Sequence, residues 1–126
     1  MLSKQDIETL SDILDHKAPH SWVVSDDVYS NLIFDKKEYT HFASYQNNWE
    51  RTLTVFSAGK LLNCTGWKIG WVVGPADPIK EAALMHEIAI YNVNVPGQVA
   101  VGLSLDQEKQ PYRGFKTYSD YVIHTF

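Results

Sequence analysis

The chain has 126 residues, of which 44% are hydrophobic and 21% are charged, so we expect one globular domain or part of one. Eleven basic residues against fifteen acidic ones give a net charge of −4, which argues against the basic surface that nucleic acids or anionic membranes require. Cys64 is the only cysteine, so an internal disulfide is excluded, and no apolar run approaches the roughly 20 residues of a membrane span. The N-terminus has no signal-peptide pattern, so we expect a cytoplasmic protein, or a mitochondrial one if an N-terminal segment is missing.

The first 25 residues predict a helix followed by a strand. Ser3 and Asp6 have the spacing of a capping box, and apolar residues recur along residues 3–14 with the helical period. Residues 22–25 are short, apolar and β-branched, which is typical of a strand that is buried on both faces of a parallel sheet. The residues expected to face the core from the helix are Ile7, Leu10, Ile13 and Leu14.

The next part of the chain predicts an irregular stretch and two more strands. Residues 30–50 are polar and aromatic without a clear period, and Ile33 and Phe34 are expected to form a brief edge strand within them. Residues 51–56 predict the second strand and residues 68–74 the third.

Residues 59–66, between these two strands, are expected to form a loop. We expect Gly59 and Gly66 to allow a close approach of the backbone within it, because glycine has no side chain.

Two helices are predicted after the third strand. Asp77-Pro78 has the pattern of a helix cap followed by proline in the first turn, and residues 91–95 break the helix that it begins. Pro96 begins a further helix that continues to about residue 104. Residues 107–114 are polar and predict a loop, and the remaining residues are too few for an assignment. The residues expected to face inward from the first of these helices are Ile79, Ala82, Ala83, His86 and Ile90.

Several side chains near the predicted strand ends are suited to carbonyl chemistry. Lys60 follows a glycine after a buried strand, where functional groups of open α/β sheets lie, and burial or nearby positive charge would activate its amine. Asp26 ends a neighbouring strand, where a carboxylate can pair with a protonated ring nitrogen, and Tyr29 offers a phenol to a ring oxygen. Ser57 and Lys68 can hold a phosphate. Together these residues predict a site for pyridoxal phosphate.

Each of these residues also has an ordinary structural interpretation. A lysine after a strand is usually solvent-exposed, and an aspartate at a strand end is usually a turn former. The spacing Ser57-x-x-Lys60 also matches the nucleophile motif of serine β-lactam-recognising enzymes, but those enzymes need a later Lys-Thr-Gly that this sequence lacks. The five histidines are scattered and no His-Glu-x-x-His is present, so no metal site is predicted.

Taken together, four segments resemble class I aminotransferases, which depend on pyridoxal phosphate and have fold type I. More narrowly, they resemble the kynurenine aminotransferase and cysteine-S-conjugate β-lyase branch. The resemblance extends from about residue 2 to residue 105, and it implies an α/β fold that is part of the large, mostly parallel cofactor-binding domain with flanking helices. The segments are SDDVY at 25–29, WERTLTV at 49–55, SAGK at 57–60 and TGWKIGWVVGP at 65–75.

The resemblance implies roles for individual residues. Lys60 matches the lysine that holds the cofactor as a Schiff base and transfers a proton between the substrate and the cofactor. Asp26 matches the partner of the pyridinium nitrogen, and Tyr29 matches the residue that bonds the ring oxygen. Ser57 and Lys68 match ligands of the phosphate.

Three further positions bear on the assembly and the substrate. Tyr91 falls where the family has an aromatic residue that reaches into the partner subunit's substrate pocket, because family members are dimers with their sites at the subunit interface. Asp27 stands where the family has glutamate, and Asn92 stands where kynurenine-using members often have histidine, which weakens the expectation of that substrate.

Family members are much longer than this chain. An Asn-Pro-x-x-Pro-x-Gly-like motif, a phosphate-binding turn and a ring-stacking aromatic precede the matched part in the family, and the small domain with a carboxylate-binding arginine follows it. None of these is identifiable here. We therefore expect residues 1–106 to be a partial cofactor-binding domain and residues 107–126 to be a divergent C-terminal segment.

Two functions remain open from the sequence. One is an aminotransferase that exchanges an amino group between an amino acid and a 2-oxo acid, like a kynurenine–oxoglutarate transaminase. The other is a catalytically inactive structural subunit derived from such an enzyme. Three strands of a larger sheet would leave apolar edges exposed, so we expect a homodimer, an aggregating chain or a part of a larger assembly.

Overall fold

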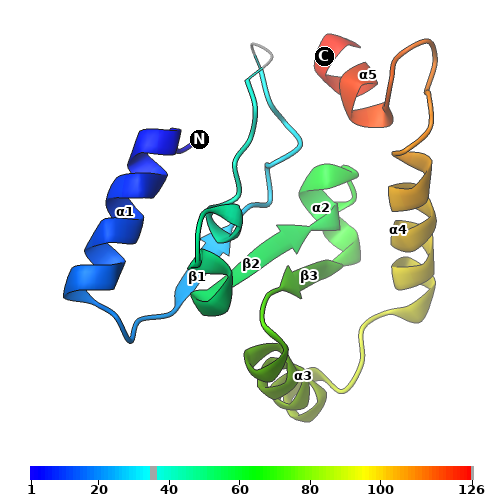
Figure 1. The fold of residues 1–126 in the computed structure, drawn as a ribbon. Coiled ribbons are helices and arrows are strands. Elements are labelled where there is room, and N and C mark those ends of the chain that lie inside the picture. The colour runs from blue at the N-terminus through cyan, green and yellow to red at the C-terminus, as the bar shows by residue number, and fades with distance from the viewer. Residues whose placement is uncertain (35–36, 126) are drawn as a thin grey trace.

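The computed structural model describes residues 1–34 and 37–125. Three strands form one sheet in the order β1-β2-β3, with β1 at Val23–Asp26, β2 at Thr52–Ser57 and β3 at Gly70–Val73 (Figure 1). β1 and β2 are parallel, as the sequence predicted, whereas β3 is antiparallel to β2. The described part of the sheet is therefore mixed, and helices lie around it.

Helix α1 (Lys4–Lys17) begins with the predicted capping box. The Ser3 hydroxyl accepts a hydrogen bond from the Asp6 N–H at 3.1 Å, and the Asp6 carboxylate accepts one from the Ser3 N–H at 2.7 Å. The predicted inward face is partly wrong, because Leu10 is 40% exposed and Ile13 is 50% exposed, whereas Ile7 is buried. The buried stripe passes through Ile7 and Ser11, one turn apart, so α1 packs along a narrower line than its apolar residues cover.

The prediction that the first strand is buried on both faces is wrong for the described residues. Val24 of β1 is 69% exposed, and Trp22, just before the strand, is 55% exposed. Side chains alternate along a strand, so Val24 and Asp26 lie on one face and Val23 and Ser25 on the other. Only the second of these faces is partly covered, and the alternating exposure along β1 reflects this.

The stretch between β1 and β2 contains the short 3-10 helices η1 (Phe42–Ser44) and η2 (Asn48–Arg51). The predicted edge strand at Ile33 and Phe34 is wrong, because neither residue pairs with a strand and Phe34 is 64% exposed. The regular structure described between β1 and β2 consists of the helical turns η1 and η2, and not of a strand that pairs with the sheet.

A buried asparagine connects this stretch to α1 and β2. The Asn48 amide donates to the Ser11 hydroxyl at 2.7 Å and to the Phe42 carbonyl at 3.3 Å. The Thr52 hydroxyl donates to the Asn48 carbonyl at 2.6 Å. Ser11, Asn48 and Thr52 are each at most 4% exposed, so this network has little access to water. Buried polar groups of this kind stabilise a fold only while every partner is present.

The predicted loop at residues 59–66 contains two short helical turns, so that prediction is wrong in part. Helix α2 (Ala58–Leu61) closes through a hydrogen bond from the Leu62 N–H to the Ala58 carbonyl at 2.8 Å, and η3 (Thr65–Trp67) follows. Lys60 therefore lies in a single helical turn directly after β2.

The two predicted later helices are α3 (Ala76–Ile90) and α4 (Val95–Gln107). The cap of α3 is Pro75, and Asp77 lies within the first turn without a capping bond, so the predicted cap is shifted. The predicted break is confirmed at Tyr91, whose φ of 69° ends α3. The predicted inward face of α3 is wrong, because no residue of α3 is buried among the described residues.

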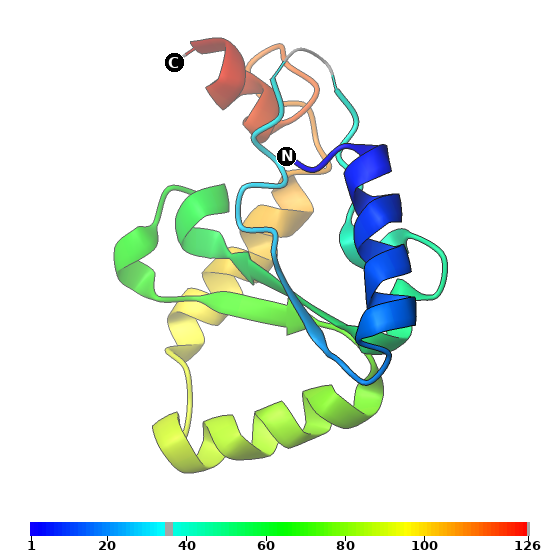
Figure 2. The same ribbon diagram turned by 90° about the vertical axis from the view of Figure 1, so that its left-hand side faces the viewer.

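The arrangement of the helices explains the exposure of α3. In both views α3 lies apart from the other helices, at the opposite end of the molecule from α5 (Tyr118–Thr125) (Figures 1 and 2). By contrast, α4 contributes to the apolar core, where buried Val101 packs with Ala58 and Ile69. Among the described residues, no helix has the length and apolar character needed to cross a membrane.

The Asn48 network predicts a measurable effect on stability. Asn48→Ala leaves the buried Phe42 carbonyl and Ser11 hydroxyl without this donor, so the free energy of unfolding should fall by about 1–3 kcal/mol. Urea unfolding followed by circular dichroism measures the change. Asn47→Ala is the matched control, because Asn47 is exposed and its side chain makes no capping bond. Equal stability of the two variants would contradict this account.

Candidate functional site

The predicted site residues gather where β1 and β2 end. Asp26 is the last residue of β1 and Ser57 is the last residue of β2, and parallel strands end at the same edge of a sheet. Asp26 lies opposite Val55, two residues before Ser57. Because side chains alternate along a strand, Asp26 and Ser57 belong to the same face of the sheet.

The structure brings Lys60 and Tyr29 together. The Lys60 amine lies 5.9 Å from the centre of the Tyr29 ring, which is near the outer limit of about 6 Å for a cation–π contact. Tyr29 follows the end of β1 and Lys60 lies in α2, so the contact joins segments far apart in the sequence. Lys60 is exposed and the Tyr29 side chain is 57% exposed, so both are accessible to a ligand.

Backbone bonds hold Lys68 beside the beginning of α2. Lys68 has a left-handed φ of 56° and ends η3, where its N–H donates to the Thr65 carbonyl at 3.4 Å. The next residue, Ile69, accepts a hydrogen bond from the Ala58 N–H at 3.0 Å. Two residues after Lys68, Gly70 pairs with Ser57 across the β2–β3 ladder. The Lys68 side chain is exposed, so a second cation is available near Ser57.

Gly59 is required by the close approach of α2 and η3. A Cβ atom at Gly59 would lie 2.8 Å from the Thr65 Cα and 3.2 Å from the Ser57 Oγ. The Thr65 hydroxyl also donates to the Gly59 carbonyl at 3.0 Å. The prediction for Gly59 is thus confirmed, whereas that for Gly66 is wrong, because a Cβ there would meet nothing within 4 Å.

Tyr91 is the predicted site residue that the structure does not bring to the others. It lies at the end of α3 and is 83% exposed. Within residues 1–34 and 37–125, no hydrogen bond, ion pair or ring contact joins its side chain to the other predicted site residues. Its proposed role in a partner's pocket stays a prediction.

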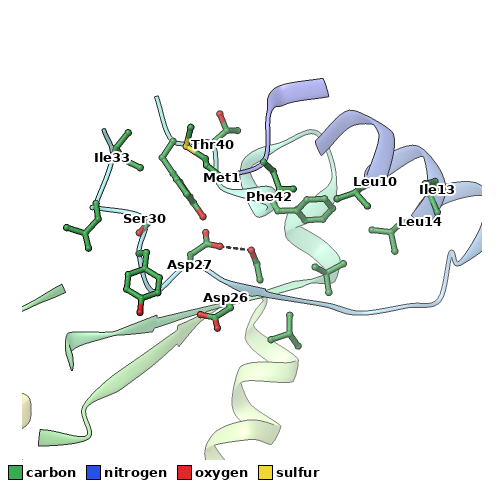
Figure 3. Close-up of a pocket in the computed structure, with 17 residues that line it drawn as sticks. Met1, Leu10, Ile13, Leu14, Asp26, Asp27, Ser30, Ile33, Thr40 and Phe42 are labelled. Atoms are coloured by element: carbon green, nitrogen blue, oxygen red, sulfur yellow. Dashed lines mark hydrogen bonds between the residues drawn. The ribbon is translucent and has the colours of Figure 1, made fainter. Parts of the chain in front are cut away.

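An open cavity of about 790 Å³ adjoins the end of β1 (Figure 3). Asp26 and Tyr29 both line it, so two of the predicted cofactor ligands border a space large enough for a small molecule. Leu10, Ile13 and Leu14 of α1 form an apolar side of this cavity, which accounts for their partial exposure. Lys60 and Ser57 do not line the cavity, since they lie beyond Tyr29 on the β2 side.

Sequence reasoning missed a buried polar cluster next to Asp26. The Asp27 side chain is only 4% exposed, and its carboxylate accepts hydrogen bonds from the Ser25 hydroxyl at 2.6 Å and from the His41 Nδ1–H at 2.5 Å. The bond to Ser25 is drawn in Figure 3. The acidic pair at the strand end was a signal for Asp27, but His41 stands in an aperiodic stretch with no local pattern to identify it.

Tyr39 completes this cluster from the same stretch. Its ring packs edge-on against the His41 ring, with 4.8 Å between the ring centres. Burial raises the pKa of Tyr39 to about 12, and the charge of Asp27 together with a hydrogen bond to it adds to the effect. Among the described residues, no group of three or more His, Cys, Asp or Glu side chains has an arrangement that could hold a metal ion.

Comparison with known proteins identifies the family. The family model for "Aminotransferase class I and II" matches residues 1–124. This chain belongs to that family. A kynurenine–oxoglutarate transaminase of Dictyostelium discoideum is 39% identical over 105 residues, which cover 83% of this chain. Human kynurenine–oxoglutarate transaminase 1 is 36% identical over 95 residues, 75% of this chain. The resemblance to the kynurenine aminotransferase branch is therefore confirmed.

Solved structures confirm the fold of this family member. N-succinyldiaminopimelate aminotransferase from Mycobacterium tuberculosis superposes on 99% of this chain with a TM-score of 0.85 and 33% identity, and this covers 30% of that protein. An aromatic aminotransferase from Pyrococcus horikoshii superposes with a TM-score of 0.79 and 26% identity, over 98% of this chain and 30% of that one.

The chain is a fragment of the large domain in comparison with its relatives. It spans 24% of the length of the Dictyostelium relative and 22% of that of the human one.

The contrast between the two glycines predicts different tolerance to substitution. Gly59→Ala puts a methyl group against the Thr65 backbone, so the α2–η3 pair must move and the free energy of unfolding should fall by about 1–3 kcal/mol. Gly66→Ala is the matched control, because nothing lies within 4 Å of its added carbon. Urea unfolding compares the two variants, and a Gly59→Ala protein as stable as Gly66→Ala would show that the close approach is not needed.

Proposed function

We propose that this chain is the cofactor-binding part of a pyridoxal-phosphate-dependent aminotransferase, which exchanges an amino group between an amino acid and a 2-oxo acid like a kynurenine–oxoglutarate transaminase. The observation that carries the proposal is the approach of Lys60 to Tyr29, beside the strand end that bears Asp26. A lysine, a phenol and a carboxylate thus converge from segments that are separate in the sequence. Family membership and the similarity to kynurenine–oxoglutarate transaminases support the same conclusion.

The donor set fits the chemical groups of this cofactor. Pyridoxal phosphate, when it is bound to a lysine, supplies an electron sink for the amino acid's Cα. Asp26 is exposed at the end of β1, so its carboxylate is available to a protonated ring nitrogen. Tyr29 is available to donate its phenol proton to the ring oxygen. Lys60 has an exposed amine that can bind an aldehyde carbon and later carry a proton at Nζ.

The phosphate would be held at the other end of the site. Ser57 offers a hydroxyl at the end of β2, and the exposed Lys68 offers a positive charge. The two residues are close along the ladder, because Gly70 pairs with Ser57 only two residues after Lys68.

The dimer and the substrate pocket involve Tyr91 in this proposal. Its side chain is 83% exposed at the end of α3, so it is free to enter the site of a second subunit. We infer that the functional form is a homodimer or a larger assembly in which further polypeptide completes the site. The substrates are an amino acid and a 2-oxo acid.

A second candidate function is a catalytically inactive structural subunit of a larger assembly. The exposure of α3 favours it, because four large apolar residues of this helix are more than half exposed. A helix with apolar residues on its surface and no buried residue is usually covered by other polypeptide. The four exposed apolar residues of α3 are Leu84, Met85, Ile88 and Ile90.

The proposed function is tested by the covalent attachment of the cofactor. Wild-type chain mixed with pyridoxal phosphate should develop the red-shifted absorbance of a lysine-bound aldehyde, and borohydride reduction should fix the cofactor on the peptide that contains Lys60. Lys60→Ala should abolish both signals, because Lys60 is the lysine whose amine lies beside the Tyr29 ring. Mass spectrometry of the digested protein locates the adduct.

Lys80→Ala is the matched control for this experiment, because Lys80 is an exposed lysine on α3, remote from the strand ends. It should retain the absorbance and the adduct at Lys60. Adducts spread equally over the exposed lysines, or an adduct that persists in Lys60→Ala, would contradict the proposal. A chain that isolates in a stoichiometric complex without the cofactor would favour the structural subunit instead.

The exposed apolar side of α3 predicts self-association. Sedimentation velocity of the wild-type chain should give a mass above that of a monomer, because burying these side chains removes apolar surface from water. Ile88→Lys with Leu84→Gln should shift the population toward the monomer. Glu81→Gln on the same helix is the control, since Glu81 is an exposed residue whose loss leaves the apolar surface unchanged. A monodisperse wild-type monomer would contradict the prediction.

A further inference from the structure

Asp26 ends β1 and Tyr29 lies in the turn that follows it, so the conformation of this turn decides how the two side chains meet a ligand. Two backbone bonds fix it. The Asp27 N–H donates to the Val55 carbonyl of β2 at 3.0 Å, and the Ser30 N–H donates to the Asp27 carbonyl at 2.9 Å. The turn is therefore built around Asp27, a residue whose side chain is only 4% exposed.

The side chain of Asp27 ties this turn to two other segments. Its carboxylate accepts bonds from the Ser25 hydroxyl within β1 and from the His41 Nδ1–H in the stretch that leads to η1. Asp26 and Asp27 are adjacent, yet Asp26 is exposed and Asp27 is 4% exposed. A buried carboxylate is costly unless it is hydrogen-bonded, and here the side-chain donors of Ser25, His41 and Tyr39 compensate for the loss of water.

The His41 ring also packs against an aromatic residue of β2, which in turn packs against β3. It packs edge-on against Tyr39 at 4.8 Å and against Phe56 at 5.9 Å, measured between ring centres. Phe56 stacks on Trp71 of β3 with 5.7 Å between their centres. Phe56 directly precedes Ser57, so the same ring that bonds to Asp27 also packs beside the strand that leads to Ser57 and Lys60.

We propose that Asp27 and His41 are positioning residues of this site: the hydrogen bond between them holds the turn after β1 in the conformation that presents Asp26 and Tyr29 to the cofactor. Neither residue is proposed to touch the cofactor. The assignment rests on the proposed function, since it gives a role to residues that support the proposed ligands. Burial and the neighbouring Asp27 carboxylate raise the pKa of Tyr39, so the phenol belongs to the same cluster as Asp27 and His41.

Two substitutions separate the hydrogen bond from the ring packing. His41→Phe keeps an aromatic ring against Tyr39 and Phe56 but removes the donor to Asp27. His41→Asn removes the ring but keeps an N–H donor at a similar distance from the backbone. If the hydrogen bond positions the turn, His41→Asn should resemble the wild type and His41→Phe should not. His20→Phe is the matched control, because His20 is exposed at the opposite end of β1.

The first readout does not need the cofactor. Hydrogen exchange followed by NMR on the free chain reports the Asp27 and Ser30 amides, which the turn protects. In His41→Phe these amides should exchange about tenfold faster than in the wild type, whereas the Leu62 amide of α2 should be unchanged. In His41→Asn and His20→Phe the exchange of all three should stay near the wild-type rate.

The second readout is the dissociation constant of pyridoxal phosphate, measured from the absorbance of the bound form. His41→Phe should raise it by about tenfold, the scale typical of losing a residue that orients a ligand-binding group, and His41→Asn should restore most of the affinity. Wild-type chain that binds no cofactor would count against the proposed function, and the exchange experiment would still decide the positioning role. Equal exchange rates in His41→Phe and the wild type, or equal losses in His41→Phe and His41→Asn, would overturn the assignment of Asp27 and His41.

Discussion

The parallel pairing of β1 with β2 is the constraint on which the site depends. It brings the end of β1, with Asp26, to the same edge as the end of β2, with Ser57. The turn after β1 and the helical turn α2 then leave the sheet side by side, and this lets the Lys60 amine approach the Tyr29 ring. No local interaction could assemble these groups, because the segments that carry them are distant in sequence. A parallel pair needs a long connection, and here that connection also supplies the residues that fix the turn.

Two adjacent aspartates illustrate how one short segment serves both structure and chemistry. Asp26 remains exposed at the strand end, whereas Asp27 is buried and fully engaged with Ser25 and His41. Burial of one carboxylate fixes the backbone, and exposure of the other leaves it available to a ligand. Sites of this kind need such support, because a polar group that is free to bind a ligand contributes little to its own orientation.

The sequence predicted the elements whose signals are local. The capping box of Ser3, the parallel strands and the break at Tyr91 follow from neighbouring residues, and the motif around Lys60 indicated the family. Burial was predicted less well. Val24 has the character of a residue covered on both sides, yet it is 69% exposed, because its face of β1 is left uncovered in the described part of the chain. His41 was not predictable, because it is 14 residues from its partner Asp27 in the sequence and the two meet only in the folded chain.

The central claim is that the carboxyl edge of β1 and β2 is the binding site of pyridoxal phosphate. The most direct test is a crystal structure of the chain grown with this cofactor. The account predicts electron density continuous from the Lys60 Nζ to the cofactor, with the ring nitrogen at Asp26 and the phosphate near Ser57 and Lys68. Cofactor density attached elsewhere, or an ordered Lys60 side chain with no density beyond its amine at saturating cofactor, would contradict it.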